Sequence, residues 1–243
     1  MAINWNTRPY IVINGTDSRS VQGLIICKLP PISLPAKMTN VETIDGRDGD
    51  IVTDLGFAAY DKDIEIGLAN EYNVDDVIAF FNATGKIVFG NEPDKYYIFG
   101  NYEQIDLERL LRMKQATVTL HVQPFKYSDD EDEEAYQFDG TNAKIKARNA
   151  GNIFSRPTIT IKGAGDISLY INGEKKLDIA LPYDGKTIII DSANMEALGI
   201  DGNFLNRLVT GNYDNITLKQ GINEIEAVGN VNEIKISLVS RWI

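Results

Sequence analysis

The sequence predicts a mainly β protein of two domains, with one helix in the first domain. Short runs in which apolar and polar residues alternate, separated by Gly, Asn and Pro, extend over most of the chain and are typical of strands. The pattern changes at six consecutive carboxylates, residues 129–134, and is almost purely β after this acidic run. We therefore expect a β-rich domain with one helix, followed by a β-sandwich or jelly roll.

The expected strands of the first domain are short and end at recognisable turns. Asn14-Gly15 is a hairpin signal, and the proline-rich segment 29–35 interrupts strand pairing because proline has no amide hydrogen. Residues 45–50 (Asp-Gly-Arg-Asp-Gly-Asp) predict a tight polar turn in which Arg47 pairs with a nearby carboxylate. Strands are expected at 9–13, 21–29, 37–44, 60–68, 86–89, 96–102 and 114–124.

The one expected helix begins after Asn73. This side chain can accept amide hydrogens of the first turn, and the two aspartates that follow favour the positive end of the helix dipole. We expect Gly85 to end the helix. Its apolar face is interpreted as a packing surface and not as a cofactor site. The residues of this face are Val74, Val77, Ile78 and Phe81.

The second domain is expected to contain only strands and turns. Asn172-Gly173 is the strongest short hairpin signal in the chain, and Asp191 and Ser192 are expected to cap a short turn through residues 193–196. Spacings of about eight to twelve residues between strands favour a sandwich. Strands are expected at 158–162, 166–171, 175–181, 186–190, 215–218, 222–228 and 233–239.

The charge is unevenly distributed. Residues 1–140 carry 12 Lys+Arg and 24 Asp+Glu, a net charge of −12, whereas residues 141–243 carry a net charge of +1. Such a surface does not favour static binding to phosphate backbones, but it suits a surface that nucleic acid passes without adhering. The acidic run is expected to be a solvated linker or exposed loop. Contact with a basic partner is the alternative, and calcium binding lacks the required ligand spacing and glycine.

The sequence predicts no catalytic residue, no metal site and no cofactor. Cys27, the single cysteine, is interpreted as a buried small hydrophobe, and His121, the single histidine, as a surface or hydrogen-bonded residue on the polar face of its strand. One cysteine and one histidine exclude a Cys/His zinc site. No phosphate-binding loop or nucleophile elbow is present. A secretory signal and a membrane-spanning helix are not expected, and neither is membrane insertion.

The order and spacing of several motifs resemble those of the distal tail protein (Dit) family of long-tailed, non-contractile (siphovirus) bacteriophages. The resemblance covers nearly the whole chain, and the acidic run is a departure from the family pattern. The motifs are Ile44-Asp-Gly-Arg-Asp-Gly49, the helix at 74–82, Phe89-Gly-Asn-Glu-Pro-Asp-Lys-Tyr-Tyr97, Gln123-Pro-Phe-Lys-Tyr127, Asn149-Ala-Gly-Asn152, Arg156-Pro-Thr-Ile-Thr-Ile161, Ile190-Asp-Ser-Ala-Asn-Met-Glu196, and 234–236 through Arg241-Trp242.

The resemblance implies a fold and a role. Residues 1–135 would form an N-terminal ring domain, and residues 136–243 a C-terminal galectin-like sandwich. The chain would be a virion structural protein at the distal end of the phage tail, assembled in the host cytoplasm. It would form a homo-hexamer, in one or two stacked rings, around a channel through which DNA passes without stable binding. Its partners would be the tail tube protein, the tail-associated lysin or fibre protein, and baseplate or receptor-binding proteins. No enzymatic activity is expected.

Two other functions are open at this stage. One is a carbohydrate-binding module for a host cell-surface glycan, which would stack a sugar on an aromatic ring. The aromatic residues of the second part are instead interpreted as packing residues, and they include Tyr170, Tyr183, Tyr213 and Trp242. The other is a hydrolase acting on cell-wall polymer, for which no motif isolates a carboxylate pair.

Overall fold

The computed structural model describes residues 8–102 and 107–243, without the side chains of residues 101, 102, 107 and 129–134. The chain divides into two compact units, one up to Tyr127 and one at Ser128–Trp242. Each unit has its own apolar core. The fold is mainly β, as the sequence predicts. No helix in the described ranges is long and apolar enough to cross a membrane.

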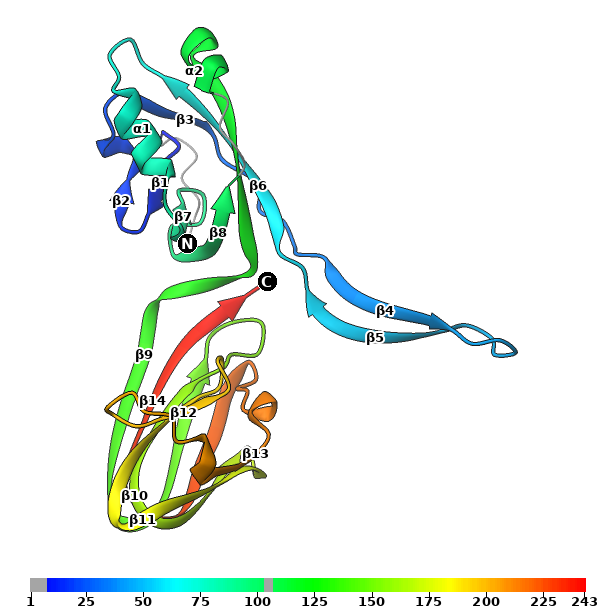
Figure 1. Ribbon diagram of the computed structural model, residues 1–243, viewed down its shortest axis with the longest axis vertical. Coiled ribbons are helices and arrows are strands. Elements are labelled where there is room, and N and C mark those ends of the chain that lie inside the picture. The colour runs from blue at the N-terminus through cyan, green and yellow to red at the C-terminus, as the bar shows by residue number, and fades with distance from the viewer. Residues whose placement is uncertain (1–7, 103–106) are drawn as a thin grey trace. The chain divides into compact units, whose positions relative to one another are not determined.

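The first unit is a sheet with two helices (Figure 1). Its strand order is β2-β1-β7-β8-β9-β6-β3. The strands are β1 (Ile11–Ile13), β2 (Thr16–Asp17), β3 (Leu24–Lys28), β6 (Tyr60–Leu68), β7 (Gly85–Phe89), β8 (Lys95–Tyr102) and β9 (Gln115–Asn149). The helices are α1 (Val74–Phe81) and α2 (Leu107–Met113), and a 3-10 turn, η1, spans Ser18–Ser20. Strand β9 continues into the second unit.

Helix α1 begins where the sequence predicts. The Asn73 side chain accepts a hydrogen bond from the amide of Asp75 at 3.0 Å, and Val77, Phe80 and Phe81 are buried in the core of the unit. The predicted end was wrong, because the helix stops at Phe81 and Gly85 begins β7. Helix α2 was not predicted, because seven residues are too few for an apolar period to be recognised.

Two strands of the first part form a separate sheet. β4 (Lys37–Thr43) and β5 (Asp50–Phe57) pair only with each other, in an antiparallel hairpin (Figure 1). Its register runs from Lys37 opposite Phe57 to Thr43 opposite Asp50, with one bulge after Met38. The turn is at residues 44–49, where Gly46 and Gly49 adopt positive φ angles of 82° and 77°. The polar turn predicted from the Asp-Gly-Arg-Asp-Gly-Asp motif is therefore the tip of a hairpin.

The second unit is a β-sandwich of long strands. The strand order is β12-β11-β10-β14-β9, and β13 pairs with a different part of β11. The strands are β10 (Thr158–Ile171), β11 (Glu174–Asp191), β12 (Glu196–Leu198), β13 (Val209–Gly211) and β14 (Gly221–Trp242). Short 3-10 turns, η2 (Asn206–Leu208) and η3 (Tyr213–Asn215), lie between the later strands. The core contains isoleucines and leucines of β10, β11 and β14.

Several pairs of predicted strands are halves of one strand. β10 contains both 158–162 and 166–171, and β11 contains both 175–181 and 186–190. Register shifts near Gly163 and Gly165 bend the ladder without ending it. A Cβ at Gly163 would lie 2.4 Å from the carbonyl oxygen of Asn230, so only glycine fits this close approach. The segment 215–218 was wrongly predicted as a strand: it contains the end of η3 and one isolated bridge between Leu218 and Ser155.

Local turn chemistry in the second unit agrees with the sequence. Asn172 and Gly173 have positive φ angles of 53° and 80° and connect β10 to β11. The Asp191 side chain accepts hydrogen bonds from the amides of Ala193 and Asn194 at 2.9 and 3.0 Å. The acidic run differs from prediction. Its backbone lies inside β9 and not in a loop, while its side chains are outside the described part.

Candidate functional site

Exposed surfaces and buried polar groups distinguish the first unit. In the described ranges, no group of three His, Cys, Asp or Glu residues is arranged to hold a metal ion. The features to account for are an exposed hairpin, the polar cluster that anchors its base, and an acidic strand face.

The β4–β5 hairpin carries apolar side chains that nothing in the described chain covers. Val52 and Leu55 are 62% and 60% exposed, and Val41 is 53% exposed. A two-stranded hairpin is marginally stable alone, because it has no second layer to bury its apolar face. An apolar surface of this kind usually marks a protein contact. The hairpin is therefore the first candidate for an assembly surface.

Polar contacts hold the two strands of the hairpin in register. Thr43 donates its hydroxyl hydrogen to Asp50 at 2.8 Å, and Lys37 forms an ion pair with Asp54 at 3.1 Å. The amide of Arg47 donates to the Ile44 carbonyl at 3.1 Å in the turn. The predicted ion pair of Arg47 is absent among the described residues. The exposed tip leaves its guanidinium in solvent.

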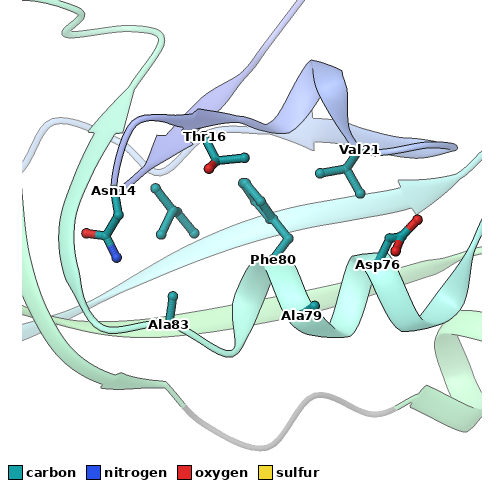
Figure 2. A pocket seen from close by; sticks show the side chains of 8 residues that line it. Asn14, Thr16, Val21, Asp76, Ala79, Phe80 and Ala83 are labelled. Atoms are coloured by element: carbon teal, nitrogen blue, oxygen red, sulfur yellow. The ribbon is translucent and has the colours of Figure 1, made fainter.

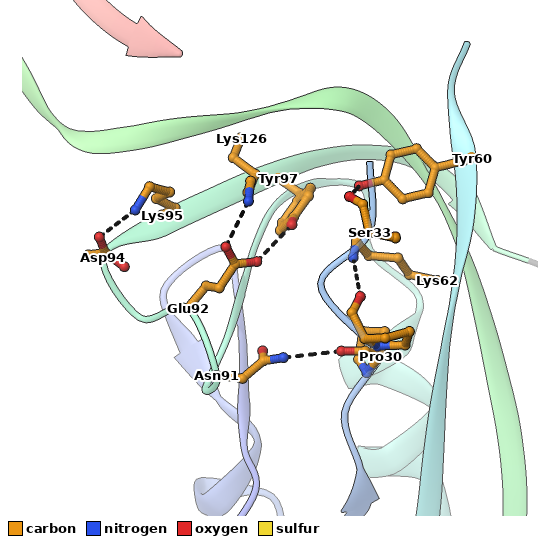
Figure 3. A network of polar contacts seen from close by, with 11 residues as sticks. Pro30, Ser33, Tyr60, Lys62, Asn91, Glu92, Asp94, Lys95, Tyr97 and Lys126 are labelled. Carbon is orange, nitrogen blue, oxygen red and sulfur yellow. Dashed lines mark hydrogen bonds and ion pairs between the residues drawn. The ribbon is translucent and has the colours of Figure 1, made fainter. Parts of the chain in front are cut away.

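The chain enters the hairpin through the proline-rich segment 29–35, and side chains bind its backbone carbonyls (Figure 3). Because its prolines have no amide hydrogen, this segment cannot join a strand ladder. The Lys62 ammonium donates to the Pro31 carbonyl, and the Asn91 amide donates to the Pro30 carbonyl, both at 3.1 Å. The Tyr60 hydroxyl donates to the Ser33 carbonyl at 3.5 Å. These contacts hold the base of the hairpin.

Lys62 is the most unusual residue of this cluster. Strand alternation places it on the core side of β6 with Ile64 and Ile66, and only 3% of it is exposed. Its Nζ lies 4.7 Å from the centre of the Tyr97 ring and 5.3 Å from that of Tyr60. Burial lowers the pKa of Lys62 to about 8, although nearby Glu92 favours the charged form.

Glu92 links the turn before β8 to strand β9. Its carboxylate accepts hydrogen bonds from Lys126 at 2.8 Å and from the Tyr97 hydroxyl at 2.9 Å (Figure 3). Lys126 and Tyr97 are both buried. Burial, assisted by the negative charge of Glu92, raises the pKa of Tyr97 far above its ordinary value. Tyr97 therefore stays protonated and acts as a hydrogen-bond donor.

The outer face of β6 carries a row of carboxylates. Asp61, Asp63 and Glu65 are exposed and alternate with buried residues, so they lie about 7 Å apart along the strand. Asp61 lies 2.7 Å from Nδ1 of His121, and Asp63 accepts a hydrogen bond from Thr119 at 2.7 Å. The interpretation of His121 as a surface, hydrogen-bonded residue is confirmed.

Cys27 lies on β3 and is exposed, so its interpretation as a buried residue was wrong. Leu24 and Ile26 are the buried residues of β3, so strand alternation places Cys27 on the outer face, and a register shift between Ile26 and Lys28 leaves it without a partner in the ladder. Its apolar neighbours in the sequence suggested burial, but only one face of the strand is buried.

A small hollow lies between α1 and the β1–β2 turn (Figure 2). Its volume is about 300 Å³, and Figure 2 shows Phe80 of α1 pointing into it. The Asn14 side chain at its edge is already engaged: it donates to the Thr84 carbonyl and accepts from the Lys86 amide, both at 2.9 Å. Most of the remaining lining is apolar, so we assign no ligand to this hollow.

In the second unit, the aromatic residues fall into two groups. Tyr213 packs against the core, as predicted, but Tyr183 is 89% exposed, so the packing interpretation was wrong for this residue. Phe154 is partly covered by Arg241, whose guanidinium lies 4.7 Å from the ring centre.

The complete chain was compared with known proteins. The crystal structure of the Dit protein (gp 19.1) of phage SPP1 matches with a TM-score of 0.68 and 14% identity, over 98% of this chain and 100% of that chain. The chain has the fold of the SPP1 Dit protein. That protein is described as a paradigm of the hub adsorption apparatus in phages that infect Gram-positive bacteria.

Chains of the phage P2 baseplate in its activated conformation also match. The calcium form has a TM-score of 0.47 and 8% identity, and the strontium form a TM-score of 0.45 and 10% identity, each over 96% of this chain and 97% of that chain. No family model and no curated protein matches the sequence.

Proposed function

We propose that this protein is a structural hub of a phage tail tip and not an enzyme. In this proposal, six copies form a ring around a DNA channel and connect the tail tube to the tail-associated lysin or fibre and to receptor-binding proteins. The observation that carries it is the SPP1 Dit fold, matched over 98% of this chain. Residues 1–135 would be the ring domain and residues 136–243 a galectin-like domain outside the ring. The protein would lie at the distal end of the virion tail, after assembly in the host cytoplasm.

The exposed hairpin supports an assembly role. Burial of its apolar side chains against a partner would be favourable, and six copies of the chain would provide such partners. The polar cluster at its base would fix the direction in which the hairpin extends, since Lys62 and Asn91 bind the carbonyls of the segment that leads into β4. A ring would thus bury surface that one chain leaves exposed.

Particle size tests the ring. Mass photometry of the full chain should show particles near 160 kDa, six times the chain mass of 27.0 kDa.

A double substitution tests the contribution of the hairpin to the ring. Val41→Thr with Val52→Thr keeps the branched shape of both side chains but replaces a methyl group with a hydroxyl in each. We expect the dissociation constant of each contact in the ring to rise ~30-fold, because each of the two apolar groups buried at an interface contributes on the order of 1 kcal/mol. Ile200→Thr with Ile222→Thr, on exposed residues of the second unit, is the matched control. A chain that remains monomeric at all concentrations refutes the proposal.

The carboxylate row of β6 is proposed to face the channel. Like charges along a wall repel the DNA backbone and let it pass without binding. Asp61→Lys with Asp63→Lys should make assembled rings retain DNA in a filter assay, while the original rings do not. Asp166→Lys with Asp184→Lys, exposed in the second unit, adds the same charge elsewhere. Equal DNA retention by both double variants would contradict a channel position for β6.

Carbohydrate binding is the second candidate, and the exposed ring of Tyr183 favours it. A flat exposed ring can stack on a sugar face. A glycan array should then give signals that Tyr183→Ala removes and that Tyr170→Ala leaves in place. An array without signals removes this candidate.

A further inference from the structure

Helix α2 carries an exposed patch of its own. Leu110 is fully buried and fixes the helix on the first unit, whereas Leu111 is 40% and Met113 71% exposed. Three cations lie within six residues around these two side chains, so the patch is apolar with a basic rim. They are Arg109, Arg112 and Lys114. Residues 107–114 have a net charge of +2, within a first part that is strongly acidic.

Local contacts hold part of this rim in place. Arg112 pairs with Glu108 on the preceding turn of α2 at 2.9 Å. The Lys114 ammonium lies 4.0 Å from the Tyr72 ring centre and donates to its hydroxyl at 2.8 Å. The Lys114 carbonyl accepts the amide hydrogen of Leu68 at 3.0 Å, which ties the end of the helix to β6.

The distal half of the β4–β5 hairpin has the opposite character. Residues 41–52 carry four carboxylates and one arginine, a net charge of −3. They surround the exposed apolar side chains of Val41, Ile44 and Val52. Both surfaces thus have an apolar centre, and the rim is acidic on the hairpin and basic on the α2 patch. This complementarity is expected of two surfaces that dock.

We propose that the distal half of the hairpin of one copy docks on the α2 patch of the next copy. Both surfaces are exposed within one chain, so the hairpin does not cover the patch of its own copy. Because the two surfaces differ, the contact is head-to-tail, and a head-to-tail contact closes into a ring when its rotation permits. The inference rests on the proposed ring and identifies the residues that would join its members.

Charge reversal tests the pairing in the full-length protein. Asp45→Lys with Asp48→Lys reverses the hairpin rim, and Arg109→Glu with Arg112→Glu reverses the patch. Each double variant alone should raise the dissociation constant of the ring by ~10-fold or more in mass photometry, because like charges then face each other. An equimolar mixture of the two double variants should recover assembly, since each altered hairpin then meets an altered patch. Asp166→Lys with Asp184→Lys, on exposed carboxylates of the second unit, is the control for net charge.

The outcomes separate the inference from the proposed function. Recovery by mixing supports the pairing and also demonstrates that both variants are folded. If the original chain forms rings that neither reversal weakens, or if mixing restores nothing, the hairpin–α2 contact is wrong while the hub remains. If the original chain forms no ring, both the inference and the proposed function fail.

Discussion

Replacing Lys62 with methionine should change how the stability of the protein depends on pH. Lys62 has a pKa of about 8 in the folded protein and an ordinary value of 10.5 when exposed. Below pH 8 both states hold the proton. Between about pH 8 and 10.5 the unfolded chain holds it and the folded chain releases it, so the free energy of unfolding rises with pH.

The magnitude follows from this difference. Each unit of pKa shift corresponds to ~1.4 kcal/mol, so the slope between pH 8 and 10.5 is at most ~1.4 kcal/mol per pH unit and the total at most ~3.5 kcal/mol. The neutral amine keeps hydrogens for the Pro31 carbonyl, so deprotonation does not release the hairpin base. Above pH 10 the raised pKa of Tyr97 acts in the opposite direction, because the unfolded chain then loses a proton that the folded chain retains.

Urea unfolding at pH 7.0, 8.0, 9.0 and 9.5, at a protein concentration where the chain is monomeric, measures the effect. The free energy of unfolding of the original chain should rise above pH 8. That of Lys62→Met should lack this rise, whatever its value at pH 7.0. Lys28→Met, which removes an exposed lysine from β3, is the control and should keep the original slope. If the original chain and Lys62→Met give parallel curves, the buried-ammonium argument is refuted.

Three further substitutions test single contacts by urea unfolding. Glu92→Gln leaves the buried cation of Lys126 without its counter-charge and should cost ~3 kcal/mol of unfolding free energy, and an effect below ~1 kcal/mol would contradict a buried pair. Gly163→Ala places a Cβ against the Asn230 carbonyl and should cost ~1–3 kcal/mol, whereas Gly100→Ala, at another glycine without a positive φ, meets no neighbouring atom and serves as the comparison. Asn73→Ala removes the α1 cap and should cost ~1 kcal/mol, a loss that Asn73→Asp should largely avoid.

Local rules explain why much of the fold was predictable. The start of α1 depends on the Asn73 side chain and its nearest amides, and the β10–β11 turn on the backbone freedom of Asn172-Gly173. The alternation in β6 correctly separated an outer acidic face from an inner one, and it placed Lys62 on the inner side. Contacts across 31 to 35 residues determine what Lys62 does there, and no local pattern contains them.

The remaining errors share one cause. Cys27 is exposed because only the Leu24 and Ile26 face of β3 meets the core, and β10 continues past Gly163 because a neighbouring strand maintains the ladder. The acidic run lies in β9 and not in a loop, although its charge and composition favour a solvated linker. Strand length is decided by the partner strand and not by the residues of the strand alone.

The chain by itself determined the mainly β class, the helix start, the principal turns and the acidic character of the first part, since each depends on residues close in sequence. Only the tertiary structure decided which apolar residues remain exposed. Val41 and Val52 have the composition of ordinary core residues, and they are uncovered because their strands pair only with each other. The buried cluster of Lys62, Glu92 and Lys126 likewise required three distant segments to exclude water around charged groups.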